Sequence, residues 1–451
     1  MSAKSENPLG WEKIPPLLKR FAIPSIIAML VGSLYNIVDQ IFIGQGVGYL
    51  GNAATNVAFP LSTICLAIGL LIGVGSSSQF SLYLGANEKR NAAHIVGNAV
   101  TLMLISGIML TLLIEIFLTP LLNIFGATPD VMPYATSYTR ITALGMPLMI
   151  GTKTMSCLAR SDGSPDYSMQ CMLIGAIINV ILDPIFIFIF QMGVTGAAIA
   201  TVVGQLVSFI MAIRYLKKFK HIRLEKEDFY LRLPFLRSIT ALGMSGSLNQ
   251  IALTLVQIVM NNSLTYYGGL SEYGKEIPLA ACGIVMKINA ILQSVIIGIS
   301  QGTQPIIGFN YGAKQYERVK QTYWLAIKYN LLLSATGFLI FQLFPRQLLS
   351  LFGEGNSMYF QFSIRFLRIF LFMVMVNGVQ LISSSFFTAI GKPGKGLFLS
   401  LTRQVIFLIP LLLILPVFME MDGIMFAGPI ADFIAFLVTT IFMIQELKST
   451  K

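Results

Sequence analysis

The chain has 451 residues, of which 55% are hydrophobic and only 11% are charged, and its mean hydropathy is +0.75. Soluble domains carry about 25% charged residues, so this composition excludes a soluble globular protein and indicates a membrane protein. The net charge of +11 does not indicate nucleic-acid binding, because the basic residues form no patch or RNA-binding motif. They lie in short loops between long apolar runs.

Twelve of these runs provide the roughly 20 residues that a helix needs to cross the hydrocarbon core. They lie near residues 21–43, 55–84, 95–117, 132–158, 166–190, 194–216, 238–263, 277–309, 323–345, 358–388, 396–418 and 423–445. The first run is too long for the apolar core of a signal peptide, so we expect it to be retained as a span. The sequence therefore predicts an all-α polytopic membrane protein with twelve transmembrane helices.

The distribution of lysine and arginine predicts the orientation of the chain. The N-terminal segment, the even-numbered loops and the C-terminus together hold 22 of the 31 basic residues, and the odd-numbered loops hold only Lys275 and Arg346. Basic residues remain on the cytoplasmic side. We therefore expect a multi-pass protein of the cell inner (plasma) membrane with both termini in the cytoplasm.

The two halves of the chain repeat each other. At an offset of 227 or 228 positions several short motifs coincide: Ala53-Ala54 with Ala280-Ala281, Gly85-Ala86 with Gly312-Ala313, LNIFG (122–126) with LSLFG (349–353), and Arg140 with Arg368. Since each half has six spans, both have the same orientation, and such repeats place a binding site between two lobes. We expect an N-lobe at residues 1–225, which includes a cytoplasmic linker, and a C-lobe at residues 226–451.

Four acidic residues lie inside the spans: Asp39, Glu115, Asp183 and Asp432. A charge at membrane depth costs about 2.5–3.5 kcal/mol even on the mildest scale, so each needs a reason. Glu115 lies near the outer end of its helix, where it reaches the interface. Asp432 lies near the centre of the last span, where it either pairs with a neighbouring helix or faces a cavity.

Asp39 and Asp183 reach nearly the same depth in the outer half of the membrane. Asp39 lies 18 residues beyond Phe21, and Asp183 lies 17 residues beyond Asp166 on another outward-running helix. With a rise of 1.5 Å per residue, both helices climb equally far. Further polar side chains arrive at this depth on the same or a neighbouring helix: Tyr35, Asn36, Asn179 and Thr201. Such a set of oxygen atoms suits Na⁺ or a proton shared by two carboxylates.

Several motifs together resemble the signatures of the multidrug and toxic compound extrusion (MATE) family. They are YNIVDQIFIG (35–44), INVILDPIFIF (178–188), MGVTGAAIATVVGQ (192–205) and GIMFAGPIAD (423–432). The resemblance covers essentially the whole chain. The seventh span of the chain lacks the carboxylate found in one branch of the family. The chain therefore resembles the DinF/MepA-like branch.

This resemblance implies a V-shaped pair of lobes and export of hydrophobic, often cationic compounds in exchange for H⁺ or Na⁺. It places the cation or proton site, including any bound Na⁺, at Asp39, Asn179, Asp183 and Thr201, with Tyr35 and Asn36 as supporting polar residues. Pro184, beside one carboxylate, is a candidate hinge because proline favours a bend. We expect a monomer that binds drugs and membrane lipids but no nucleic acid, with no enzymatic activity and no cofactor beyond the coupling ion.

Three alternatives remain open on the sequence. A lipid-linked saccharide flippase shares the architecture and needs a basic cavity, for which Lys153, Lys287 and Arg403 lie within spans. An intramembrane aspartyl protease also needs two buried aspartates, but its glycine-rich pattern is absent around NIVDQ and VILDP. A receptor or channel is distinguished from a transporter by the absence of pumping against a concentration gradient.

Overall fold

The computed structural model describes residues 7–351 and 356–449, which form helices joined by short connections. In the first half the helices are α1 (Ile14–Val47), α2 (Tyr49–Gly85), α3 (Lys89–Ile116), α4 (Leu118–Ile124), α5 (Met132–Ser161), α6 (Pro165–Pro184) and α7 (Gly193–Ile213). In the second half they are α8 (Leu233–Leu270), α9 (Glu276–Gly312), α10 (Tyr316–Leu343), α11 (Pro345–Ser350), α12 (Ser357–Phe370), α13 (Val374–Ala389), α14 (Pro393–Leu401) and α15 (Ile409–Ser449).

Short helical segments of other types connect these elements. The 3-10 segments are η1 (Pro8–Gly10), η3 (Arg214–Lys217) and η4 (Lys226–Phe229). The π-helical segments are η2 (Ile185–Ile189) and η5 (Thr402–Leu408), which continue α6 and α14, respectively. Both π segments therefore lie in the fifth span of their half.

The helices account for the twelve expected spans. Nine helices in the described ranges are long and apolar enough to cross a membrane, and α12 and α13, bent by 47°, form a tenth span. One of the nine, the 57-residue stretch Pro393–Ser449, is interrupted at Glu420, where φ is 50°, and so contributes two spans. The 30-residue helix α5, which is more polar, completes the set. The predicted class of twelve-helix membrane protein is confirmed.

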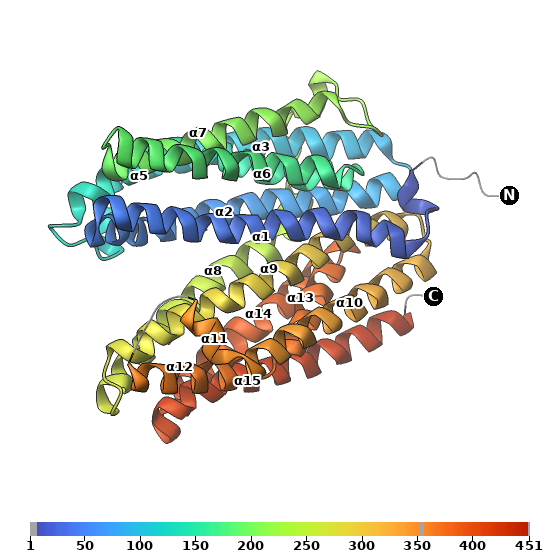
Figure 1. Ribbon diagram of the computed structural model, residues 1–451. Coiled ribbons are helices and arrows are strands. Elements are labelled where there is room, and N and C mark those ends of the chain that lie inside the picture. Colours follow the sequence, from blue (N-terminus) through green and yellow to red (C-terminus); the bar gives the residue numbers. More distant parts are fainter. Residues whose placement is uncertain (1–6, 352–355, 450–451) are drawn as a thin grey trace.

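The helices form two bundles (Figure 1). Helices α1–α7 make the N-lobe and α8–α15 the C-lobe, and the lobes lie close together at the end that carries both termini and diverge towards the opposite end. Helices α1 and α9 join the two lobes. Their contacts extend from Ala22, beside Gly302, to Ser33, whose hydroxyl lies 2.6 Å from that of Ser294. The predicted boundary at residue 225 falls in the connection before η4 and stays a prediction.

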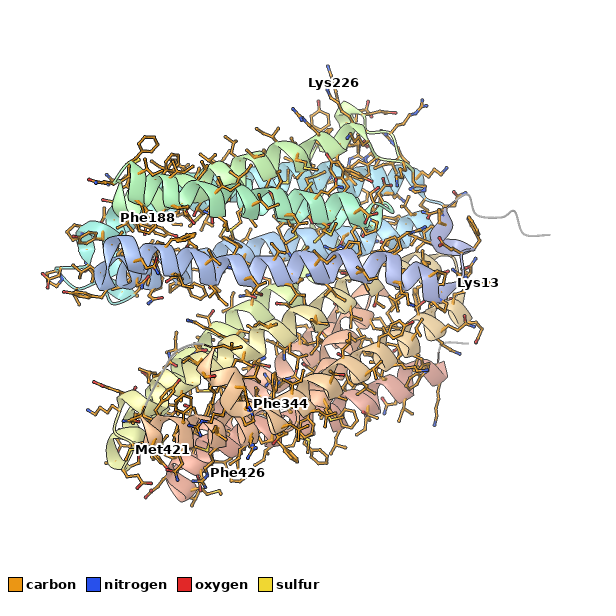
Figure 2. The ribbon with its side chains drawn as sticks, viewed as in Figure 1. Lys13, Phe188, Lys226, Phe344, Met421 and Phe426 are labelled. Atoms are coloured by element: carbon orange, nitrogen blue, oxygen red, sulfur yellow. The ribbon has the colours of Figure 1, made fainter. Side chains whose placement is uncertain are left out.

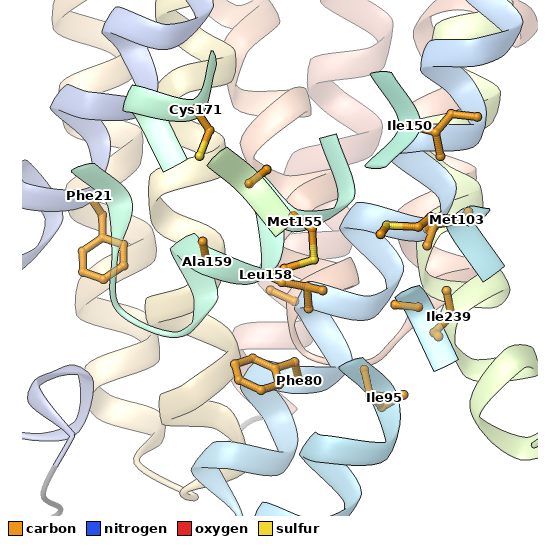
Figure 3. Packing of buried hydrophobic residues seen from close by; sticks show 14 of the residues in the cluster. Phe21, Phe80, Ile95, Met103, Ile150, Met155, Leu158, Ala159, Cys171 and Ile239 are labelled. Atoms are coloured by element: carbon orange, nitrogen blue, oxygen red, sulfur yellow. The ribbon is translucent and has the colours of Figure 1, made fainter. Parts of the chain in front are cut away.

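The N-lobe core is packed with large apolar side chains from several helices (Figure 3). Phe21 of α1, Phe80 of α2 and Leu158 of α5 belong to one fully buried cluster. Burying an aliphatic or aromatic side chain of this size contributes about 1.5–3 kcal/mol in water. In a membrane that driving force is smaller, and close packing and interhelical hydrogen bonds have the larger share.

Glycines allow the two lobes to touch through their backbones. A Cβ atom on Gly85 would lie 1.9 Å from the carbonyl oxygen of Phe309, and one on Gly312 would lie 2.1 Å from that of Leu82. Both pairs are related by the same offset of 227 positions. Phe309 is the equivalent of Leu82, and Gly312 is the equivalent of Gly85, so the two contacts are equivalent to each other. The axis of the internal repeat therefore lies between α2 and α9.

Substitution of Gly302 by alanine is expected to push the lobes apart and lower the thermal midpoint of unfolding. Its Cβ would lie 2.7 Å from the backbone nitrogen and Cα of Ala22. Gly283→Ala on the same helix is the control, because nothing lies within 4 Å of its Cβ position. There alanine is expected to add up to about 1 kcal/mol of helix stability. Equal midpoints for the two variants in detergent would contradict this account of the interface.

Two polar clasps hold the lobes together at the end with the termini. The segment before α1 is held by the C-lobe, where Arg318 donates hydrogen bonds to the carbonyl oxygens of Leu9 (3.0 Å) and Glu12 (2.7 Å). The segment before α8 is held by the N-lobe, where Asn98 donates to the carbonyl oxygen of Asp228 (3.2 Å). The first helix of each lobe is thus anchored on the other lobe.

Candidate functional site

Two buried carboxyl groups lie side by side in the N-lobe. Asp39 lies in the C-terminal half of α1 and is 8% exposed, and Asp183, at the penultimate position of α6, is 0% exposed. Their carboxyl groups are close enough to interact with each other. Two carboxylates that share a site disfavour each other's ionised form, so such a pair favours binding of a proton or a cation.

Asn179 connects this pair to α7. Its amide nitrogen donates hydrogen bonds to Oδ1 of Asp183 and to Oγ1 of Thr201, each at 3.2 Å. The two helices approach closely enough because Gly175 and Gly204 face each other, and a Cβ on Gly204 would lie 2.6 Å from the carbonyl oxygen of Gly175. The four residues expected at the site, two acids and their two companions, are therefore brought together.

The cluster leaves several oxygen atoms free to bind a ligand. Oδ1 of Asp39, Oδ2 of Asp183 and Oδ1 of Asn179 are buried without a hydrogen-bond partner among the described residues. Buried polar atoms are normally satisfied, so such a group of acceptors needs a cationic or protonic partner. Carboxylate and amide oxygens are the ligands that hard cations prefer. The donor set thus fits either a shared proton or Na⁺.

Two tyrosines border the carboxylates. Tyr35, one turn before Asp39, and Tyr138 of α5 are both half-buried and lie within electrostatic reach of both acids. Sequence reasoning identified Tyr35 but missed Tyr138. The same depth argument would have found it, because Tyr138 lies seven positions into a helix that descends from the outer side, as Thr201 lies nine positions into α7.

The structure places the two remaining candidates differently. Asn36 is exposed, and its amide nitrogen donates to the carbonyl oxygen of Gly32 at 2.7 Å on its own helix. Its role in the cavity stays a prediction. Pro184 ends α6 directly after Asp183, and the backbone continues as the π-helical segment η2. Such segments are frequent at functional sites, although the hinge itself also stays a prediction.

The other two acids of the spans have basic partners. Asp432, which is 3% exposed, receives a hydrogen bond from Nε of Arg403 and another at 3.1 Å from the amide of Asn377. Of the two readings of Asp432, pairing with a neighbouring helix is therefore correct. Glu115 lies 3.5 Å from Nε of Arg140 near the surface. Among the four acids, only Asp39 and Asp183 face each other without a cation.

Comparison with known proteins shows the family to which the chain belongs. The family model described as MatE matches residues 24–185 and 245–414. The chain is 24% identical over 394 residues to the probable multidrug resistance protein YoeA of Bacillus subtilis, covering 85% of this chain and 82% of YoeA. It is also 24% identical over 420 residues to the multidrug export protein MepA of Staphylococcus saprophyticus, covering 92% and 90%, respectively.

Solved structures share the whole fold. A MOP superfamily transporter from Pyrococcus furiosus, for which a reversed polarity of the binding pocket suggests a different function, has a TM-score of 0.92 at 24% identity. An outward-facing multidrug resistance MATE transporter of the MOP superfamily also has a TM-score of 0.92 at 24% identity. Each comparison covers 100% of this chain and 99% of the other. With the family model matching most of the sequence in both halves, the chain belongs to the MatE family.

Proposed function

We propose that the protein is a secondary active multidrug efflux antiporter that exports hydrophobic, often cationic compounds in exchange for H⁺ or Na⁺. The named relatives YoeA and MepA support multidrug export. The observation that carries the coupling is the buried Asp39–Asp183 pair with its unpartnered oxygens. Transport would follow alternating access, with drugs bound between the lobes by apolar, aromatic and methionine side chains that adapt to varied shapes.

The ion and the drug would be linked through the state of the N-lobe site. An inward-moving ion that binds Asp39 and Asp183 neutralises them and so changes which conformation of α1 and α6 is stable. Pro184 and the π-helical segment after it offer a place where α6 can bend in response.

The excess of basic residues in the even-numbered loops supports cytoplasmic termini. A phosphatase reporter that is active in the periplasm when fused after residue 225 would overturn that orientation.

Transport by the purified protein in proteoliposomes tests this function. A fluorescent hydrophobic cation is expected to accumulate when a Na⁺ gradient or a pH gradient is imposed separately, and the effective gradient identifies the coupling ion. Several unrelated hydrophobic cations should compete with it. Transport that is indifferent to both gradients, or strict selectivity for one polar metabolite, would contradict the proposal.

A lipid-linked saccharide flippase is less well supported, because such a cavity needs free cations for pyrophosphate. Arg403, one of three basic residues of the spans considered for it, is paired with Asp432. Failure of the protein to move a lipid-linked saccharide under the conditions that drive drug transport would remove this alternative.

A further inference from the structure

The two lobes differ at one pair of equivalent positions near the outer ends of their helices. Glu115 is the penultimate residue of α3, and 227 positions later Gln342 is the penultimate residue of α10. Their partners Arg140 and Arg368 are also equivalent. In the N-lobe the pair is a carboxylate and a guanidinium 3.5 Å apart. In the C-lobe an amide replaces the carboxylate.

This replacement leaves the charge of Arg368 without a counter-ion within residues 7–351 and 356–449. Its Nη2 donates to the carbonyl oxygen of Gln342 at 2.9 Å, and the amide of Gln342 donates to the carbonyl oxygen of Arg368 at 3.0 Å. Neither contact neutralises the guanidinium, and no carboxylate in the described residues forms an ion pair with it. The nearby Arg365 is paired with Asp422 at 2.8 Å, so that acid is already engaged.

Arg368 stands at the edge of an apolar groove on the C-lobe. The groove has a volume of about 530 Å³ and lies where α12 bends into α13 beside α15, with Gln342 and Arg368 on its rim. Phe426, labelled in Figure 2, belongs to its wall. The apolar wall comprises Ile369, Phe372, Phe426, Pro429, Ile430 and Phe433. Phe372 and Phe433 are 52% and 47% exposed, respectively.

The position of this groove relative to the membrane determines its chemistry. Gln342 lies in the last turn of a span, at the end opposite to the termini, so Arg368 lies at the level where headgroups meet the hydrocarbon core. A guanidinium there prefers a phosphate, which it can bind through two parallel hydrogen bonds. The phenylalanine-lined wall offers the complementary surface for an acyl chain.

We propose that this groove is a binding site for an anionic phospholipid of the leaflet opposite to the termini. The phosphate binds Arg368, and one acyl chain lies against α12, α13 and α15. The equivalent arginine of the N-lobe, Arg140, already has Glu115 as its counter-ion. The site does not depend on the direction or coupling of transport.

Lipid retention by the delipidated full-length protein tests the site. We expect native mass spectrometry with dioleoylphosphatidylglycerol to show a bound lipid that dioleoylphosphatidylcholine replaces poorly. Arg368→Gln should weaken phosphatidylglycerol binding about tenfold or more, as expected for the loss of a charge-assisted contact. Gln342→Glu should have a similar effect, because it recreates the N-lobe ion pair and leaves the apolar wall of the groove unchanged.

The controls separate the headgroup from the chain and the C-lobe from the N-lobe. Arg140→Gln should leave phosphatidylglycerol binding unchanged, whereas Ile430→Trp should reduce it by filling the groove. Inorganic phosphate at the same concentration should not compete. Retention of lipid by both Arg368→Gln and Gln342→Glu would overturn the proposal, and so would equal losses in Arg140→Gln or competition by free phosphate.

Discussion

Replacing Asp183 or Asp39 by asparagine is expected to abolish gradient-driven export without impairing insertion or folding. Asparagine keeps the size of the side chain and removes a charge from membrane depth, which costs the folded protein little. It also removes the group that binds the coupling ion. At about 100 mV one inward-moving charge contributes about 2.3 kcal/mol, so an uncoupled variant loses roughly a 50-fold concentration ratio of drug.

The measurement is drug accumulation in proteoliposomes under imposed Na⁺ and pH gradients, with amounts of inserted protein matched. Glu115→Gln is the control, because Glu115 is paired with the exposed Arg140 and ion pairs near the surface contribute at most about 1 kcal/mol. That variant should export at close to the unmodified rate. An aspartate variant that keeps both the rate and the response to the gradients would rule out the proposed coupling step.

Replacing Arg403 by methionine is expected to destabilise the C-lobe strongly. Asp432 would then keep a buried negative charge with only Asn377 as a hydrogen-bond partner. Removing one member of a buried ion pair typically costs about 3–5 kcal/mol, whereas replacing both by apolar residues is often neutral. The double variant Arg403→Met/Asp432→Leu should therefore recover most of the stability that the single variant loses.

The thermal midpoint of unfolding in detergent is compared among the unmodified protein, Arg403→Met, Asp432→Leu and the double variant. A pair that serves folding alone predicts recovery of both the midpoint and drug transport in the double variant. Recovery of the midpoint without recovery of transport would instead assign Asp432 a direct part in the transport cycle. An unchanged midpoint in Arg403→Met would show that the pair contributes nothing to stability.

The shared depth of Asp39 and Asp183 could be predicted from the sequence, because the rise of a helix is fixed and both helices cross the membrane in the same direction. Counting residues brought Asp39, Asp183 and Thr201 to one level before any packing was known. The direction in which each side chain points around its helix could not be predicted in the same way, because it depends on contacts between helices. These contacts leave Asn36 exposed and bring Tyr138 towards the acids.

The partners of charged residues were equally difficult to predict. Asp432 and Arg403 lie in different spans, and only the packing of α15 against η5 brings them together. The clasps at residues 9–12 and 228–232 could not be predicted either, since loop conformation has no periodic sequence signal. The family motifs include the four residues expected at the N-lobe site. They gave no indication that Gln342 stands beside Arg368 where the N-lobe has a glutamate.

Gly85 meets Phe309 and Gly312 meets Leu82 in two equivalent contacts, so this single chain is built like a homodimer whose subunits have been joined. An isologous interface forces every residue in a true homodimer to serve both subunits, so a change of one side chain is made twice. Joining the subunits removes that restriction. In the N-lobe, Asp39 and Asp183 lie together with no basic side chain paired to them in the described residues. In the C-lobe, Asp432 is paired with Arg403. Two halves that are not identical can thus carry different chemistry on one symmetric frame.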